Sequence, residues 1–184
     1  MKRLSFLIVL LFSSAAFAQK TYIQCGKLID GVADKPQTEV TIIVEGNLIA
    51  DIQKGYTHGG SSDKVIDLKN KTVMPGLIDC HVHLESQGSK KSMLDGCTTT
   101  DADVAYEAAV YAKRTLMAGF TTVRDLGGWG VNISLRKAVR QGLVEGPRII
   151  TAGRAISGSG GHMDNSVGFR DDVFNHKMGP DDGV

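Results

Sequence analysis

Two histidines separated by a single residue have the clearest capacity for chemistry in this sequence. His81, Val82 and His83 follow the apolar pair Leu77-Ile78, which is typical of a buried β-strand. Side chains alternate between the two faces of a strand, so both imidazoles should project from one face and Val82 from the other. Two neutral imidazoles side by side supply half of the ligand set of a divalent metal ion, most plausibly zinc.

The neighbouring residues extend this interpretation. Asp79 adds a carboxylate two positions before His81, which a regular strand would place on the same face. Cys80 should face the opposite side, where we expect a small buried hydrophobic residue. A His-x-His pair by itself is also typical of an ordinary polar strand face, so the metal interpretation needs support from the rest of the chain.

Three segments supply that support because they resemble motifs of one enzyme family. The start of the catalytic barrel in the amidohydrolase superfamily of metal-dependent hydrolases is similar to VMPGLIDCHVHLES, and its second strand and exit loop are similar to GFTTVRDLGG. The loop after the third strand, SGSGGH, resembles that of the imidazolonepropionase-like branch, which includes secreted prolidase-like peptidases.

The resemblance implies both a reaction and the roles of individual residues. In the family, one or two divalent metals, usually zinc, activate a water molecule that attacks a C–N carbonyl carbon, and an aspartate moves the proton to the leaving nitrogen. His81 and His83 would hold the more buried metal, and His162 would contact the substrate; a flexible surface loop is the alternative for His162. The other ligands and the catalytic aspartate belong to later strands, which we expect beyond Val184, so no catalytic residue is assigned here.

The elements that position these residues follow from the hydrophobic pattern. Between Thr21 and Leu68 the pattern is all-β: residues 40–45 alternate as a half-buried strand should, and Gly46-Asn47 is typical of a hairpin turn. In the family, such segments form part of a small β-sandwich beside the barrel.

Strands and helices alternate after the histidine pair. Thr100 and Asp103 predict the capping box of a first helix, which Gly119 ends, and Asn132 predicts the N-cap of a second helix. Arg124 and Asp125 close the second barrel strand, where either could reach the site. We interpret the two as a local ion pair that holds strands together.

The fold class that follows is α/β. We predict a signal peptide over residues 1–18, a β-sandwich segment over 19–73, and the first three or so β/α units of a (β/α)₈ TIM-like barrel over 74–184. A complete barrel needs about 250 residues, so the barrel is incomplete in this chain.

The first 18 residues are typical of a secretory signal peptide. A charged start, Lys2-Arg3, precedes a short apolar run and the small-residue ending Ala16-Phe17-Ala18. The run is too short for a stable membrane anchor, so we expect a periplasmic or secreted protein that begins at Gln19.

Composition excludes some partners and leaves the redox state open. The net charge of +1 gives no reason to expect a nucleic-acid partner. Three cysteines at wide spacing, Cys25, Cys80 and Cys97, do not make a disulfide framework, although any two of them could be bridged.

We therefore predict an exported metal-dependent amidohydrolase that acts on a small-molecule amide, cyclic amide or dipeptide. The chain would be its N-terminal fragment, inactive alone, and its oligomeric state is not predicted. Two alternatives stay open: a catalytically dead secreted metal-binding or scaffold protein that uses only His81 and His83, and a truncated product without function.

Overall fold

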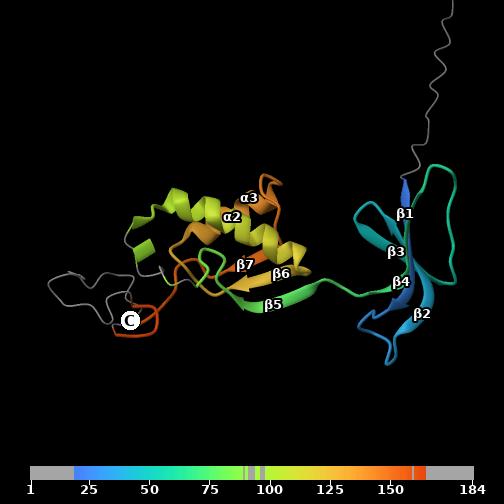
Figure 1. Cartoon of the computed structure of the whole chain (residues 1–184), viewed down its shortest axis with the longest axis horizontal. Helices are drawn as coiled ribbons and strands as arrows, with labels where there is room; N and C mark the ends of the chain where they lie inside the picture. Colours follow the sequence, from blue (N-terminus) through green and yellow to red (C-terminus); the bar gives the residue numbers. More distant parts are fainter. Residues whose placement is uncertain (1–18, 89, 91–93, 96–97, 159, 165–184) are drawn as a thin grey trace, which may run out of the picture. The chain divides into compact units, whose positions relative to one another are not determined.

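A computed structural model of the chain describes residues 19–88, 90, 94–95, 98–158 and 160–164. The predicted signal peptide and Cys97 lie outside the described residues. The chain divides into two compact units between Pro75 and Gly76 (Figure 1). Each unit has its own hydrophobic core.

The N-terminal unit is a four-stranded sheet with the strand order β3-β2-β1-β4. Its strands are β1 (Lys20–Leu28), β2 (Gln37–Glu45), β3 (Leu48–Lys54) and β4 (Lys64–Val73). β2 pairs antiparallel with both β1 and β3, whereas β1 and β4 run parallel. The predicted hairpin turn is confirmed, because Gly46 joins β2 to β3 with a positive φ of 61°.

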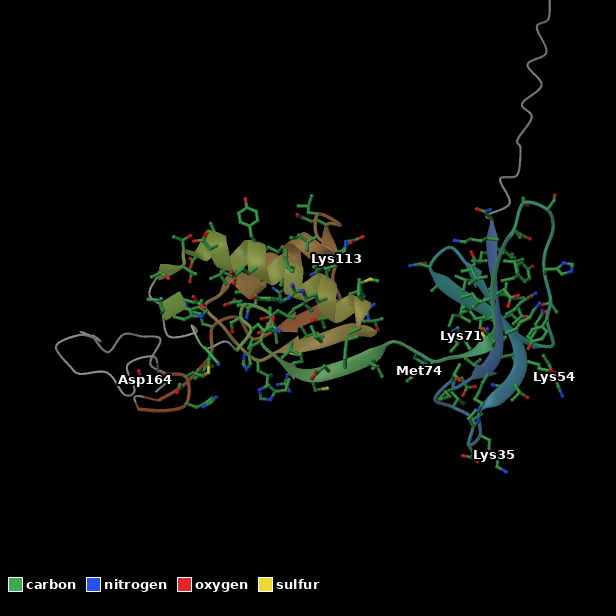
Figure 2. All side chains as sticks on the ribbon, in the orientation of Figure 1. Lys35, Lys54, Lys71, Met74, Lys113 and Asp164 are labelled. Atoms are coloured by element: carbon green, nitrogen blue, oxygen red, sulfur yellow. The ribbon has the colours of Figure 1, made fainter. Side chains whose placement is uncertain are left out.

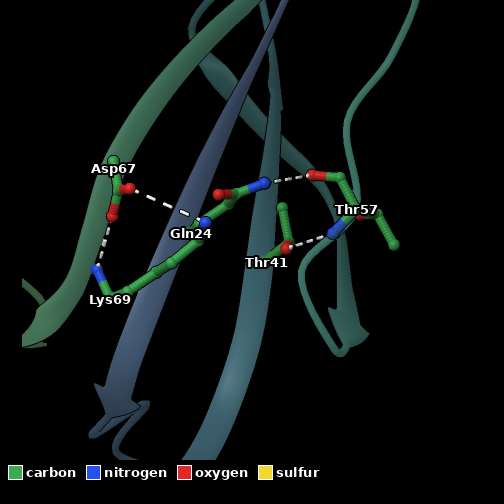
Figure 3. Close-up of polar contacts among 5 residues, drawn as sticks. All are labelled: Gln24, Thr41, Thr57, Asp67 and Lys69. Carbon is green, nitrogen blue, oxygen red and sulfur yellow. Dashed lines mark hydrogen bonds and ion pairs between the residues drawn. The ribbon is translucent and has the colours of Figure 1, made fainter.

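The prediction that β2 is half-buried is wrong, because the chain covers its second face. Thr41 is fully buried although it lies on the face expected to be wet. Its hydroxyl donates to the carbonyl of Gly55 (2.8 Å) and accepts the N–H of Thr57 (3.0 Å). The side-chain amide of Gln24 donates to the carbonyl of Thr57 at 3.0 Å, so the loop after β3 is held against the sheet (Figure 3).

The C-terminal unit alternates strands and helices. Its elements in chain order are β5 (Leu77–Val82), α2 (Asp101–Met117), β6 (Phe120–Asp125), α3 (Val131–Arg140) and β7 (Arg148–Thr151). The three strands are parallel and adjacent in the order β5-β6-β7. Two helices thus connect three parallel strands, and the prediction of about three β/α units over 74–184 stays a prediction.

Both helices cover the same face of this sheet (Figure 1). Side chains of the strands and helices fill the space between the two layers (Figure 2). The buried residues of this core are Leu84, Ala108, Ala112, Val123, Leu135 and Ile149.

The opposite face of the sheet is open among the described residues. On this face Ile78 is 66% exposed and Ile150 is 56% exposed, and Leu77, next to Ile78 in the chain, is 40% exposed. The prediction that Leu77 and Ile78 are buried is therefore wrong for this structure. In a closed barrel the face without helices is the interior, and three strands do not close one.

Helix α2 begins and ends where the sequence predicted. The Thr100 hydroxyl accepts the N–H of Asp103, and the Asp103 carboxylate accepts the N–H of Thr100 at 2.8 Å, which makes a complete capping box. Gly119 follows the C-cap residue with a φ of 100°, a conformation that favours glycine. Within the described ranges, no helix is both long and apolar enough to cross a membrane.

Candidate metal centre

The histidine pair lies at the carboxyl end of β5. The ring centroids of His81 and His83 are 5.4 Å apart, with their planes inclined by 74°. Val82 packs against the helix-covered core, whereas both histidines are exposed. The two imidazoles are thus adjacent and accessible, as two ligands of one metal ion must be.

A backbone carbonyl orients the His83 ring. Its Nδ1 lies 2.7 Å from the carbonyl oxygen of Gly127, in the loop after β6. A carbonyl only accepts hydrogen bonds, so Nδ1 carries the proton and the Nε2 lone pair of the neutral ring is left for another partner. Metal-binding histidines usually donate their second nitrogen in this way, so the arrangement suits Nε2 of His83 as a metal ligand.

Asp79 supports the backbone at His81, not the ring. Between Asp79 and Val82, strand β5 contains one residue more than the matching part of β6, because Asp79 pairs with Val123 whereas Val82 pairs with Asp125. The predicted common face of Asp79 and His81 assumed strict alternation, and this irregularity makes the prediction wrong. The Asp79 carboxylate accepts the N–H of His81 at 3.0 Å.

Cys80 lies in the same irregular stretch of β5. It is exposed, with a free thiol, so the prediction of a buried residue is wrong. Strand β5 forms an edge of the sheet, and its irregularity prevents Cys80 from joining the helix-covered core. Cys25 is the other free cysteine of the described chain, and burial raises the pKa of its thiol.

Asp125 has a different role from the one predicted. It is fully buried and forms no ion pair with Arg124 in the part of the chain that the structure describes. Its carboxylate accepts the N–H of Leu84 (2.9 Å), the N–H of Gly127 (3.1 Å) and the side-chain amide of Asn132 (3.0 Å). The predicted ion pair is wrong because the donors that reach this carboxylate come from two neighbouring loops and from α3.

Helix α3 begins two residues earlier than predicted, and Asn132 does not cap it. Gly130 is the N-cap residue and makes no side-chain hydrogen bond. The Glu85 carboxylate takes that place: one oxygen accepts the N–H of Asn132 and the other that of Trp129, each at 2.5 Å. Asn132 turns inward, where its amide also donates to the carbonyl of Gly153 at 2.9 Å.

Sequence reasoning missed Glu85, which is 4% exposed. The sequence feature from which its position could have been inferred is the double glycine of the GFTTVRDLGG motif. A Cβ on Gly128 would overlap the Glu85 carboxylate. A Cβ on Gly127, whose φ is 139°, would press on the backbone of Ala155 at 2.7 Å. The loop after β6 therefore packs too closely for side chains at either position.

His162 is exposed in the loop after β7. Local hydrogen bonds shape this loop, from the N–H of Gly160 to the Asp164 carboxylate (2.6 Å) and from the N–H of Met163 to the Ser157 hydroxyl (3.3 Å). No contact brings His162 to the histidine pair in the described residues, so its substrate-binding role stays a prediction.

The described residues do not complete a metal site. No group of three or more His, Cys, Asp or Glu side chains is placed to hold an ion within them. A hollow of about 470 Å³ lies between the loop after β5 and α2, and its lining includes Glu85, Tyr111 and Trp129 but neither histidine of the pair.

Known proteins of one enzyme family are similar to this chain in sequence. Residues 72–177 match the Amidohydrolase family. Ochratoxinase from Aspergillus niger is 30% identical over 162 residues, which are 84% of this chain and 32% of that protein. Imidazolonepropionase from Picrophilus torridus is 41% identical over 54 residues, 29% of this chain and 13% of that protein.

Solved structures give the same picture. A Xaa-Pro dipeptidase with bound methionine is 39% identical with a TM-score of 0.80, over 90% of this chain and 41% of that one. A prolidase complexed with N-methylphosphonate-L-proline is 32% identical with a TM-score of 0.71, over 88% and 37% respectively. The chain spans about a third of the length of the ochratoxinase. The predicted fold class, α/β with an incomplete barrel, is confirmed.

Proposed function

Because this chain belongs to the amidohydrolase family, we propose that it contributes two metal ligands to a hydrolase that cleaves amide or dipeptide-like C–N bonds. One observation carries the proposal: His81 and His83 lie side by side, and the Gly127 carbonyl fixes the His83 ring so that Nε2 is left for a metal. The similarity to a Xaa-Pro dipeptidase and to an ochratoxinase supports the substrate class.

In this proposal His81 and His83 would hold a divalent ion, zinc by the nitrogen character of these ligands, which would supply a water of lowered pKa and polarisation of the scissile carbonyl. The protein's own residues hold the ligands in place. Gly127 fixes the ring of His83, and Asp79 fixes the peptide of His81. His162, on the loop after β7, would contact the substrate.

The test uses hydrolysis of Xaa-Pro dipeptides and N-acyl amino acids, with zinc, by the purified hydrolase to which this chain contributes the two ligands. His81→Ala and His83→Ala should each lower the rate by at least about 100-fold, because metal polarisation supplies several kcal/mol of transition-state stabilisation. His58→Ala is the matched control, since His58 is an exposed histidine of the N-terminal unit. Hydrolysis that survives His81→Ala would overturn the proposal.

A metal-binding protein without catalysis is the second candidate. The observation that favours it is that the described residues bring together two ligands, whereas a catalytic zinc site normally has three protein ligands and a water. Zinc binding that depends on the histidine pair, without hydrolysis of any substrate in the panel, would favour this candidate over the hydrolase.

We also propose that the protein is exported through residues 1–18. The support is the charged start, the short apolar run and the ending Ala16-Phe17-Ala18. N-terminal sequencing of the protein recovered from outside the cytoplasm should give Gln19 as the first residue. Recovery there with Met1 still in place would contradict cleavage.

A further inference from the structure

The buried carboxylate of Asp125 connects two loops and the first turn of α3 beside the candidate metal centre. It is fully buried at the end of β6, and three N–H donors reach its two oxygens. Oδ2 accepts the N–H of Leu84, while Oδ1 accepts the N–H of Gly127 and the side-chain amide of Asn132. This is an unusually complete set of partners for a residue that the proposed reaction does not use.

Two of these three hydrogen bonds lead directly to His83. The Leu84 N–H belongs to the peptide bond that follows His83, so Asp125 holds the backbone from which the imidazole projects. Gly127 donates its N–H to Asp125 at 3.1 Å and accepts the Nδ1 proton of His83 at 2.7 Å. The carboxylate therefore holds the histidine from both sides, through its own backbone and through the partner of its ring.

Packing also restricts the two backbone segments that the Asp125 carboxylate joins. Gly127 adopts a φ of 139°, which favours glycine, and packs closely on Ala155. Leu84 is 3% exposed and anchored in the core between helices and sheet. Because the core also holds Leu84, we expect a change at Asp125 to act on the Gly127 carbonyl more than on the His83 backbone.

We propose that Asp125 is a positioning residue that fixes the ring orientation and the tautomer of His83, keeping its Nε2 free for the metal. The proposal rests on the proposed function in taking His83 as a metal ligand. Its general basis is that the hydrogen bond at one imidazole nitrogen decides which nitrogen can bind a metal.

Asp125→Asn is the most informative change because it preserves the shape of the side chain. An asparagine offers one acceptor oxygen and adds an NH₂ donor, so it cannot satisfy the three donors that now meet the carboxylate. Asn132→Ala is the matched control. It removes the third donor to the same carboxylate but leaves the hydrogen bonds with Leu84 and Gly127.

Two readouts separate positioning from a merely structural role. The first is the tautomer of His83 in the metal-free protein, measured from its imidazole ¹⁵N shifts. The second is the dissociation constant for zinc alone. We expect Asp125→Asn to lose the Nδ1–H tautomer as the dominant form and to bind zinc about 10- to 100-fold more weakly. Asn132→Ala should keep the tautomer and bind zinc within about twofold of the parent, whatever it does to stability.

The outcomes are distinguishable. If Asp125→Asn folds and keeps both the tautomer and the zinc affinity, the positioning role is overturned. If His83→Ala leaves zinc binding unchanged, the proposed function is contradicted, because His83 is then not a zinc ligand. The tautomer measurement still tests whether Asp125 positions the His83 ring. Should Asp125→Asn not fold, the parent protein decides: the proposal requires an Nδ1–H tautomer and slow hydrogen exchange at the Leu84 and Gly127 amides. An Nε2–H tautomer or fast exchange overturns it.

Discussion

The Glu85 carboxylate holds the start of α3 from a position 47 residues earlier in the chain than Asn132. Each of its oxygens accepts one backbone N–H at the beginning of the helix, from Trp129 and Asn132. The N-terminus of a helix leaves such donors without intrahelical partners, and its positive dipole end favours a carboxylate. One side chain thereby ties the loop that follows the histidine pair to the second helix.

Removal of this carboxylate should be costly. Glu85→Ala leaves two N–H groups without acceptors, and we expect the free energy of unfolding in urea to fall by about 1–3 kcal/mol. Glu145→Ala is a control, because Glu145 forms an exposed ion pair with Lys113, and it should change stability by no more than about 1 kcal/mol. Equal midpoints for the two variants would contradict the role given to Glu85.

At the scale of the element, the capping box of α2 makes the start of the helix sensitive to pH. Hydrogen bonds from the side chain and then the backbone N–H of Thr100 lower the pKa of the Asp103 carboxyl from its ordinary value of 3.8. A lowered pKa means that the folded state favours the carboxylate. The stabilisation is therefore fully present above the ordinary value and is lost as the pH falls through the lowered one.

Thr100→Ala tests this account of the helix terminus. Without the hydroxyl, the largest cause of the shift is gone, so the pKa of Asp103 should rise toward its ordinary value. An NMR titration of the Asp103 carboxyl carbon measures this directly. The pKa of Asp30, which backbone hydrogen bonds of Ala33 and Val32 lower in the other unit, should not change. A pKa of Asp103 unaffected by Thr100→Ala would contradict the capping box.

Elements with local signals were predictable, and elements fixed by distant partners were not. The capping box of Thr100 and Asp103 and the turn at Gly46 depend on residues a few positions apart, and both were predicted. Asparagine is a residue type that often caps helices, yet the carboxylate of Glu85, from another loop, accepts the N–H groups at the start of α3. The alternating pattern predicts that Thr41 is exposed to solvent. The loop after β3 instead covers it through hydrogen bonds that no sequence pattern predicts.

The candidate site likewise has features that the sequence predicts and features that depend on distant partners. The spacing of His81 and His83 was enough to predict two adjacent imidazoles. The carbonyl that orients His83 belongs to Gly127, 44 residues later, and only the folded loop shows it. The irregularity in β5 likewise depends on pairing with β6, which is why the face assigned to Asp79 was wrong.

At the scale of the whole molecule, the chain consists of two units with separate cores, of which the C-terminal one carries the histidine pair. Its three parallel strands bring three exit loops to one edge of the sheet (Figure 1). Asp125, Asn132 and Glu85 connect these loops through buried hydrogen bonds. The unit thus has a defined edge where the proposed metal centre would lie, with His81 and His83 as two of its ligands.

The central claim is that His81 and His83 hold a metal ion together, and locating zinc in the protein tests it most directly. Anomalous diffraction at the zinc edge from zinc-loaded crystals should place the ion about 2.0–2.1 Å from Nε2 of His83 and from a ring nitrogen of His81. The same site should be lost in the His81→Ala, His83→Ala double variant. Zinc bound away from both histidines, or retained in full by the double variant, would contradict the account.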